Sequence, residues 1–469
     1  MPSLAEGEKM RAILEIPLTL GEIISATEAF AIEKDKSKRI RAITTDTREM
    51  ETGDLFIALQ GERYDGERFC DKAEALGCDF ISAKDKGGLL VKDTRVALLA
   101  IAKLYKTKLT SLKYTVAITG SVGKSTTKEM LGSMLSGEKV HLTRENYNNY
   151  IGLSYTVLSA PKDTEYLILE LGTNHPGEIE EMSLAVEPNL AVITKIGTAH
   201  IGSFGSREMI AKAKLEIRAG LSESAALLIP HDEKLLPHDS NVKTVSDCYN
   251  KGNYSLVSLS GNNKKTKVSF SSKEAQLTAE PTVFGDGNLR ALAFAAACMF
   301  EMKFAVNNII DRFSLISHNN TRQNIYNWQG RTLLDDAYNA SFESVMNAFG
   351  LMRFYKGRRC AVLGDVLELG NETENIHFKI GSEAVNHGIE LLFLFGVYAP
   401  FIERGAISAG LKKERIFINS DVTSPSITLD KIQEVTRSGD VILFKASHRC
   451  NFSKLCEALR LREEKSNVG

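Results

Sequence analysis

The stretch YTVAITGSVGKSTTKEMLGSML, residues 114–135, decides the fold of this chain. An apolar run at 114–119 leads into a glycine-bearing loop, and residues 125–135 continue with helical character. A strand, a glycine loop and a helix in this order predict a phosphate-binding unit in a parallel α/β sheet. Glycines let backbone N–H groups turn towards phosphate oxygens, and the helix N-terminus adds a partial positive charge. We therefore expect ATP to bind at Gly120, Ser121, Val122, Gly123, Lys124, Ser125 and Thr126.

The loop departs at one position from the usual phosphate-loop pattern, GxxxxGK[ST]. That pattern places a glycine at 118, where this chain has Ile118, and Gly120 follows two residues later. A glycine turn that happens to precede Lys-Ser is the alternative, but the strand before it and the helix after it favour a phosphate loop. In such a loop Lys124 reaches the terminal phosphates and Ser125 ligates Mg²⁺.

Length and composition narrow the class of protein. The 469 residues predict about three domains, because a single core seldom serves more than about 250 residues. A net charge of -1 argues against nucleic acid and anionic membranes as partners. Residues 291–300, among the longest apolar runs, are too few to span a bilayer, and residues 1–12 lack the apolar core of a signal peptide. The seven cysteines form no CxxC pair, so we expect reduced thiols in a cytoplasmic protein.

Alternating apolar runs and helical stretches predict three α/β domains. Residues 1–112 form a small N-terminal domain, residues 113–321 a central parallel-sheet domain of the P-loop ATPase type, and residues 322–469 a Rossmann-like, doubly wound domain. The expected strands are 41–46, 54–59, 78–83, 114–119, 166–171, 190–196, 331–335, 359–363, 391–395, 415–418 and 441–445. The expected helices include 96–105, 125–135, 206–221 and 288–302, and residues 243–273 are expected to form hairpins and loops.

Two residues near strand ends are candidate metal ligands. Glu170 lies near the end of the apolar strand expected at 166–171, where a carboxylate is costly unless it is paired or bound to a metal. The alternative is a glutamate that already faces water. His200 follows the next strand, and in a parallel sheet it emerges at the same edge as Glu170 and the phosphate loop.

Lys214 lies on an apolar helical stripe. Apolar residues recur at helical spacing between 206 and 221, and Lys214 follows Ile210 by four residues, whereas Lys212 is expected to point to solvent. A protected neutral amine can take up carbon dioxide and become a carbamate, which is an oxygen ligand for metals. Spacing alone favours the alternative, a lysine that extends its head group to water.

Five segments along the central part resemble the Mur ligase family in order and spacing. The phosphate loop of that family also lacks the first glycine, so Ile118 fits the resemblance. The segments are TGSVGKST (119–126), NYNNYIG (146–152), ELGTN (170–174), IGTAH (196–200) and AKLEI (213–217).

The resemblance implies ATP as substrate and two Mg²⁺ ions as cofactors. It implies that the metal ligands are Ser125, Glu170, His200 and Lys214 as a carbamate. The implied catalytic residues are Lys124, Glu170, His200 and Lys214. Beyond the phosphate loop, the implied ATP-binding residues are Asn288, Arg322 and Asp336.

The two outer domains carry family segments of their own. TDTR (45–48), with GDLFIAL (53–59) and Asp65-Gly66, is similar to the UDP-sugar-binding domain of the family. DDAYNAS (335–341), VLGDVLELG (362–370) and KAS (445–447) resemble the branch that adds D-alanyl-D-alanine. The implied substrate-binding residues are Asp46, Thr47, Arg48, Asn146, Asn149, Tyr338 and Asn339.

The chain departs from the family at two places. GDGN (285–288) stands where the family shows Gly-x-His-Asn, and the later Asn of that motif is Ala291. DAYNASF (336–342) replaces Asp-Ser-Tyr-Asn-Ala-Asn-Pro. The adenine and dipeptide contacts are therefore expected to differ from the family pattern.

The resemblance implies an ATP-dependent ligase that joins D-alanyl-D-alanine to UDP-N-acetylmuramoyl-tripeptide through an acyl phosphate, as a cytoplasmic monomer. Another Mur-type amide ligase is an alternative. Folylpolyglutamate synthase is a second one, but it starts almost directly at its nucleotide domain, whereas 113 residues precede the strand at 114. A catalytically silent nucleotide-sugar sensor is a third, because fold does not fix function. The intact Lys124, Glu170, His200 and Lys214 argue against that reading.

Overall fold

The structure is a computed structural model that describes residues 11–32, 34–61, 64–248, 251–317, 323–419 and 425–466. The chain divides into two compact units. The first comprises residues 1–119, 135–191 and 216–227, and the second comprises residues 120–134, 192–215 and 228–469. This division does not follow the three predicted domains, whose boundaries stay a prediction.

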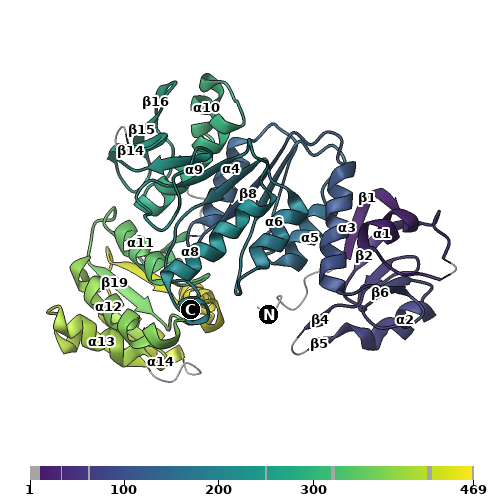
Figure 1. Ribbon diagram of the computed structural model, residues 1–469. Helices are drawn as coiled ribbons and strands as arrows, with labels where there is room; N and C mark the ends of the chain where they lie inside the picture. The colour runs from purple at the N-terminus through teal and green to yellow at the C-terminus, as the bar shows by residue number, and fades with distance from the viewer. Residues whose placement is uncertain are drawn as a thin grey trace. The chain divides into compact units, whose positions relative to one another are not determined.

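Residues 11–108 form a five-stranded sheet and its helices within the first unit (Figure 1). Its elements are β1 (Arg11–Thr19), α1 (Leu20–Thr27), β2 (Arg39–Thr44), β3 (Leu55–Ile57), β4 (Gln60–Gly61), β5 (Tyr64–Asp65), η1 (Gly66–Phe69), α2 (Cys70–Ala75), β6 (Asp79–Ser82), β7 (Leu89–Leu90) and α3 (Thr94–Lys108). The strand order is β1-β2-β3-β6-β7, with β1 antiparallel to β2 and the others parallel. The prediction lacks β1, whose charged residues interrupt the apolar pattern of a strand.

The second sheet has nine strands and contains the phosphate loop. Its elements are β8 (Tyr114–Thr119), α4 (Lys124–Met134), β9 (Val140–Leu142), α5 (Tyr150–Leu158), β10 (Tyr166–Glu170), α6 (Glu178–Val186), β11 (Leu190–Ile193), α7 (Ile201–Phe204), α8 (Arg207–Leu215), η2 (Glu216–Gly220), β12 (Ala226–Pro230), β13 (Val242–Ser246), β14 (Tyr254–Gly261), β15 (Thr266–Ser272), β16 (Gln276–Ala279), α9 (Asp286–Glu301) and α10 (Val306–Phe313). The strand order is β16-β15-β14-β13-β12-β11-β8-β10-β9. β8 has the predicted bounds, and the helix predicted at 206–221 is α8 followed by the tighter η2.

Helix α3 joins the N-terminal sheet to the helices that follow β9 and β10. It packs on α1 and β1, and also on α5 and α6 (Figure 1). The buried hydroxyl of Tyr105 donates to the carbonyl of Ala160 at 3.0 Å, and Arg95 pairs with Glu181 at 3.0 Å. The first unit is therefore one packed body.

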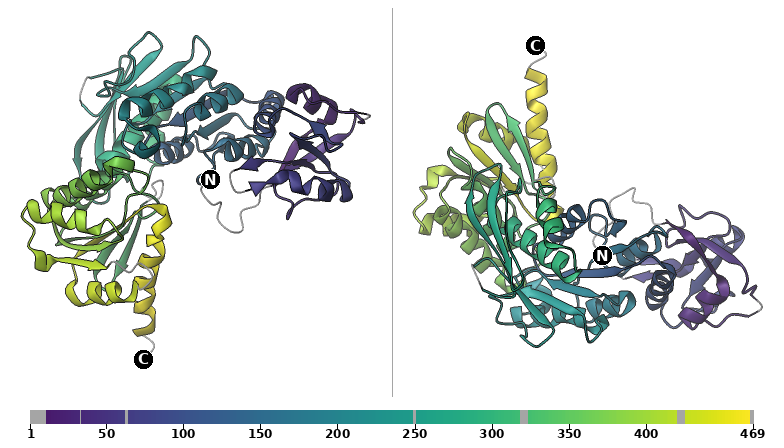
Figure 2. Two further views of the ribbon diagram at one scale, coloured as in Figure 1. Left: turned by 60° about the horizontal axis from the view of Figure 1, so that its bottom comes forward. Right: turned by 90° about the horizontal axis from the view of Figure 1, so that it is seen from above.

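The third sheet belongs to the second unit and has six strands. Its elements are β17 (Asn324–Trp328), β18 (Arg331–Asp335), α11 (Phe342–Met352), β19 (Arg359–Leu363), η4 (Gly370–Glu372), α12 (Thr373–Asn386), β20 (Ile389–Phe395), α13 (Ala399–Ser408), η5 (Lys413–Arg415), β21 (Ile416–Asn419), α14 (Pro425–Val435), β22 (Val441–Lys445), η6 (His448–Cys450) and α15 (Phe452–Ser466), drawn in yellow in Figure 2. The order is β17-β18-β22-β19-β20-β21, parallel except for β17. Trp328, Phe393 and Phe444 lie in its core. The predicted α/β class, with a doubly wound C-terminal sheet, is confirmed.

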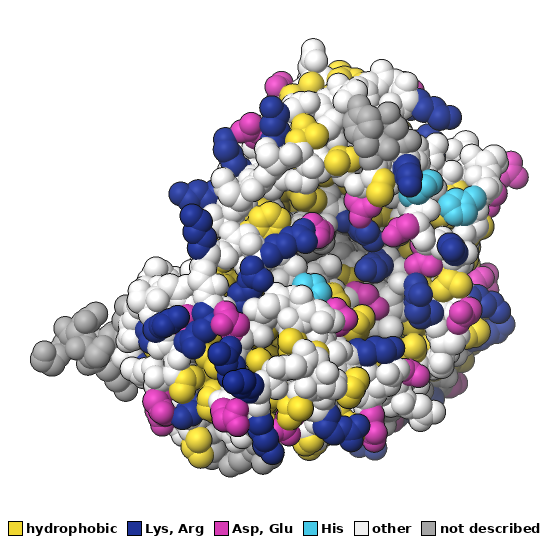
Figure 3. All heavy atoms as spheres, turned by 90° about the vertical axis from the view of Figure 1, so that its left-hand side faces the viewer, with side chains coloured by type: hydrophobic (Ala, Val, Ile, Leu, Met, Phe, Trp, Pro, Cys, Tyr) yellow, Lys and Arg dark blue, Asp and Glu magenta, His cyan; other side chains and the backbone are white. Residues whose placement is uncertain are grey.

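The charged side chains on the surface and the free cysteines agree with the expectations from composition. In the part of the chain that the structure describes, no helix is long and apolar enough to cross a membrane. All seven cysteines are free thiols, and five of them are buried. Acidic and basic side chains are interspersed on the face in Figure 3, as the balanced net charge implies.

Candidate active site

The phosphate loop is held in shape by its glycines and by Thr194. Gly120 and Gly123 have φ values of 140° and 92°, in the region that favours glycine. A Cβ atom at Gly120 would lie 2.1 Å from the Thr194 hydroxyl, which donates to the carbonyl of Val122 at 2.6 Å. Lys124 begins α4, and its Nζ donates to the carbonyl of Gly120 at 2.8 Å. The loop is therefore preformed, with its lysine folded over it.

The chain segment after β11 holds the phosphate loop through hydrogen bonds to Ser121. The N–H of Ser121 donates to the carbonyl of Lys195 at 2.8 Å, and the Ser121 hydroxyl accepts from the N–H of Gly197 at 3.0 Å. Ser125 lies in the first turn of α4 and is 6% exposed. Helix N-termini with unpaired N–H groups bind anions, so the geometry suits a polyphosphate.

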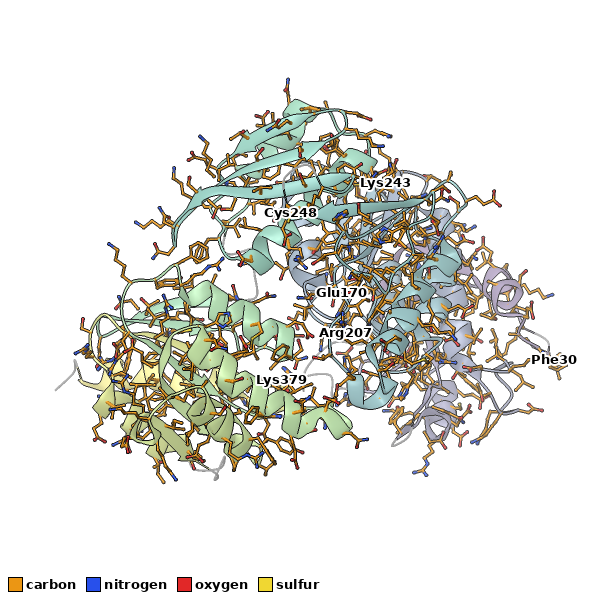
Figure 4. All side chains as sticks on the ribbon, turned by 60° about the vertical axis from the view of Figure 1, so that its left-hand side comes forward. Phe30, Glu170, Arg207, Lys243, Cys248 and Lys379 are labelled. Carbon is orange, nitrogen blue, oxygen red and sulfur yellow. The ribbon has the colours of Figure 1, made fainter. Side chains whose placement is uncertain are left out.

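Glu170 is a buried carboxylate at the carboxyl end of β10 (Figure 4). It is 1% exposed and lies opposite Ile118 of β8 in the parallel register. Its Oε1 accepts from the Nδ2 of Asn148 at 2.9 Å. A Cβ atom at Gly172 would lie 2.8 Å from the Asn148 amide, so glycine there allows the amide to approach. The alternative of a glutamate that faces water is wrong.

The two asparagines predicted to bind substrate have different environments. Asn149 caps α5, where its Oδ1 accepts from the N–H of Gly152 at 2.9 Å. The Oδ1 of Asn146 is buried and has no hydrogen-bond partner among the described residues. An orphaned buried acceptor costs about 1–3 kcal/mol, so Asn146 is the better candidate for a ligand contact.

His200 is held by a carboxylate from the C-terminal sheet domain, within the second unit. Its backbone has φ 61°, and its Nδ1 lies 2.5 Å from Oε2 of Glu368. The N–H of Gly202 donates to the carbonyl of Glu368 at 2.9 Å. The bond to His200 lowers the pKa of the Glu368 carboxyl. A carboxylate on one ring nitrogen fixes the imidazole and directs the other nitrogen to a metal in many metal sites.

Lys214 is buried in α8, whereas its neighbour Lys212 is exposed. Lys214 is 3% exposed and shares the helix face of Ile210 and Ala213. A lysine that extends its head group to water is therefore wrong. In the described ranges, no group of three or more His, Cys, Asp or Glu side chains is placed to hold a metal ion. The predicted Mg²⁺ ligands instead combine Ser, Glu, His and Lys.

Lys445 organises the predicted dipeptide site. Its side chain is 1% exposed, and its Nζ lies 3.0 Å from Oδ2 of Asp336. The same Nζ donates to the carbonyls of Asp336 and Asn339 at 3.0 Å. The Nδ1 of His448 donates to the carbonyl of Tyr338 at 3.1 Å, and the backbone N–H of His448 donates to Oδ1 of Asn339 at 3.3 Å. Tyr338 and Asn339 are thus fixed by the segment after β22.

A glutamine connects two of the predicted ATP-binding residues. The Nδ2 of Asn288 donates to Oε1 of Gln323 at 3.2 Å, and the Nε2 of Gln323 donates to Oδ2 of Asp336 at 3.4 Å. Asn288 and Asp336 therefore belong to one network that ends at Lys445. The predicted Arg322 lies outside the described residues.

The predicted UDP-binding residues form a turn after β2. Arg48 pairs with Asp46, with Nε and Nη2 at 3.0 and 2.5 Å from Oδ2. This pairing lowers the pKa of the Asp46 carboxyl, while the guanidinium stays 84% exposed. The carbonyl of Thr47 accepts from Nζ of Lys72 at 3.0 Å. An exposed guanidinium on a braced turn is suited to a diphosphate.

Comparison with known proteins identifies the family of the chain. Family models match residues 39–106 as the Mur ligase family catalytic domain, 118–299 as the Mur ligase middle domain and 321–448 as the Mur ligase glutamate ligase domain. A UDP-N-acetylmuramoyl-tripeptide–D-alanyl-D-alanine ligase of Bacillus subtilis (strain 168) is 34% identical over 435 residues, covering 90% of this chain and 93% of that protein. This chain belongs to the Mur ligase family.

Solved structures of Mur ligases show the same fold. A crystal structure of MurF from Acinetobacter baumannii has a TM-score of 0.85 and 26% identity, covering 95% of this chain and 99% of that one. A crystal structure of MurF from Thermotoga maritima in complex with ADP has a TM-score of 0.78 and 28% identity, covering 90% and 98%. The Mur ligase fold therefore extends over nearly the whole chain.

The departures from the Mur ligase pattern have a structural counterpart. At Gly287, where the pattern has histidine, a Cβ atom would lie 2.8 Å from the Nδ2 of Asn347 on α11. Asp286 beside it pairs with Arg353 at 2.7 Å. The side chain of Asn347 thus occupies space that a histidine at 287 would need.

Sequence reasoning missed several residues of this Mur ligase site. Asn148 and Glu368 were recognised only as members of motifs, and their motif positions were the available signal. Glu343, which accepts from the N–H of Thr198 at 2.8 Å, has no sequence signal of its own. Gln323 has none either, because its two partners lie far apart in the sequence.

Proposed function

We propose that this chain uses ATP to join D-alanyl-D-alanine to UDP-N-acetylmuramoyl-tripeptide, giving the pentapeptide precursor of peptidoglycan. One observation carries the proposal beyond the family. The three C-terminal segments that distinguish this branch meet in one hydrogen-bonded cluster. Lys445 binds the carbonyl of Asp336, while Ser447 donates to the carbonyl of Asp365 and accepts from the N–H of Leu367.

The proposed reaction has two steps. The carboxylate of the tripeptide attacks the γ-phosphate, which forms an acyl phosphate and releases ADP. The amine of the dipeptide then attacks the acyl carbon and phosphate leaves. Lys124, at the start of α4, and the N–H groups of the phosphate loop are proposed to neutralise charge on the phosphoryl group. Asp336 and Arg322 are proposed to contact the nucleotide from the C-terminal domain.

The proposed Mg²⁺ ligands are Ser125, Glu170, His200 and a carbamylated Lys214. Three of the four donors fit this ion, because hydroxyl, carboxylate and carbamate oxygens are ligands that Mg²⁺ prefers, while His200 would add one nitrogen donor. Bound Mg²⁺ would supply positive charge to the transferring phosphoryl. Glu170 and Lys214 are 1% and 3% exposed, so both proposed ligands lie inside the protein and not on its open surface, which supports the proposal.

The substrate ends are assigned to the outer parts of the chain. Asp46, Thr47 and Arg48 are proposed to bind the uridine diphosphate, and Asn146 the muramoyl-peptide side. Tyr338 and Asn339 are proposed to bind the dipeptide. We propose the boundaries 1–112, 113–321 and 322–469 for the three functional domains, in a cytoplasmic monomer.

Phosphate release by the purified protein tests this function. The assay contains ATP and UDP-N-acetylmuramoyl-tripeptide, with or without D-alanyl-D-alanine, and mass spectrometry identifies the product. Release that requires both substrates and yields the pentapeptide supports the proposal. No release with any UDP-muramoyl peptide would overturn it and favour the silent sensor. Release with a folate and glutamate instead would favour folylpolyglutamate synthase.

A further inference from the structure

The phenol of Tyr155 reaches from α5 to the turn that holds the predicted UDP-binding residues. Its oxygen accepts from the N–H of Thr45 at 2.8 Å and lies 3.2 Å from the Thr45 hydroxyl. The Tyr155 side chain is 4% exposed, and its burial raises the pKa of the phenol, which therefore stays protonated. All of these residues belong to the first unit.

The turn that follows Thr45 is stabilised by hydrogen bonds between successive residues. The hydroxyl of Thr44 accepts from the N–H of Asp46 and donates to its carbonyl, both at 3.0 Å. Asp46 in turn accepts from the N–H and the side chain of Arg48. The orientation of the Arg48 guanidinium therefore depends on the backbone that Tyr155 holds.

The other end of α5 is attached to Glu170. Asn149 caps the helix, and Asn148 beside it donates to Oε1 of Glu170. Six residues separate Asn149 from Tyr155, which is about 9 Å of helix at 1.5 Å per residue. The segment from Asn148 to Tyr155, which includes the N-cap and the first six residues of α5, thus contacts the buried carboxylate near one end and the turn near the other.

We propose that Tyr155 is a positioning residue that fixes the turn at 45–48, and with it the uridine diphosphate end of the substrate, at a set distance from Glu170. This inference rests on the proposed function of the turn. A reaction that joins two bound groups depends on their alignment, and a shift of about 1 Å can cost about 100-fold in rate. The helix supplies a rigid spacer between the two ends of the substrate.

Tyr105 provides a matched control. Its hydroxyl is also buried and also connects the N-terminal part to the end of α5, through the carbonyl of Ala160. Among the described residues, its hydroxyl bonds to Ala160 and not to the turn at 45–48. Tyr155→Phe and Tyr105→Phe each remove one buried hydroxyl and keep the ring. The first substitution frees the N–H of Thr45, and the second frees the carbonyl of Ala160.

The test measures UDP binding by calorimetry and steady-state kinetics of the ligase, with thermal melting as the check on folding. For Tyr155→Phe we expect Kd for UDP and KM for the UDP-substrate to rise about 3- to 10-fold, the range for one lost hydrogen bond. KM for ATP is expected to stay within about twofold. Tyr105→Phe is expected to leave both values within about twofold while it lowers the melting temperature to a similar extent.

Three outcomes would overturn the inference. Unchanged UDP binding in Tyr155→Phe would overturn it alone and leave the proposed function standing. An equal rise of Kd in Tyr105→Phe would show a general loss of packing instead of positioning. No UDP binding by the wild type would overturn the proposed function of the turn, and the inference with it.

Discussion

The phosphate loop and the dipeptide region are both polar sites at the carboxyl ends of parallel strands, but they are built differently. Backbone N–H groups, glycines and one lysine form the phosphate loop within residues 120–126. The proposed dipeptide region combines three distant segments, which are joined through Lys445 and Ser447. The shape of a site made from one continuous segment depends on a few residue types at fixed positions. In a site made from a side-chain network, several residues can be replaced together while the hydrogen bonds between them are kept.

The largest effect is expected in the phosphate loop. Lys124→Ala removes the charge that is proposed to face the transferring phosphoryl, so phosphate release is expected to fall by about 1,000-fold. The melting temperature is expected to change little, because the glycines and Thr194 hold the loop. Wild-type release by Lys124→Ala would contradict the assignment of this loop to ATP.

A pair of lysines on α8 tests the metal site. Lys214→Gln is expected to lower turnover by about 100-fold, because it removes the amine that would carry the carbamate. Lys212→Gln, at an exposed position two residues earlier on the opposite side of the helix, is expected to behave like the wild type. Removing dissolved carbon dioxide should lower the activity of the wild type and of Lys212→Gln. Equal activity of the two variants would remove Lys214 from the proposed site.

The dipeptide region is expected to respond in stability as well as in binding. Lys445→Met leaves Asp336 without its buried partner, which is expected to cost about 3 kcal/mol of unfolding free energy. KM for D-alanyl-D-alanine is expected to rise about tenfold, with KM for the UDP-substrate unchanged. Lys379→Met on the exposed face of α12 is the control (Figure 4). A variant with unaltered KM for the dipeptide would break the comparison, because the network would then be structural only.

The smallest effect is expected far from both regions, at the start of α1. Glu22 pairs with Lys108 and accepts from the N–H of Thr19, and these bonds lower its pKa to about 2. A lowered pKa stabilises the fold above the ordinary value near 4.5, and the stabilisation is lost as the pH falls towards 2. Because the pair is partly exposed, Glu22→Gln is expected to cost only about 0.5 kcal/mol at pH 7. The difference in melting temperature from the wild type should shrink at pH 3; a constant difference would assign the effect to packing.

The parallel strands and the phosphate loop were predictable because their residues act locally. β8, β18, β19 and β22 have the predicted bounds, since runs of buried apolar residues end at turn residues. β1 was missed because its exposed face carries charges, and Glu343 and Gln323 were missed because their partners lie far away in the sequence. Tertiary hydrogen bonds of this kind leave no periodic pattern. The site roles of Lys124, Glu170, His200 and Lys214 stay predictions until they are tested.

Helix α3 has a consequence for how the chain can be divided. It covers α1 and β1 with one face and α5 and α6 with another. Cutting the chain at the predicted boundary after residue 112 would uncover apolar surface on both fragments. We therefore expect the fragment 1–112 to aggregate when expressed alone, while a fragment that extends through α6 keeps this helix covered. The N-terminal sheet therefore shares a hydrophobic core with α5 and α6 through α3, and we do not expect it to fold as a separate binding module.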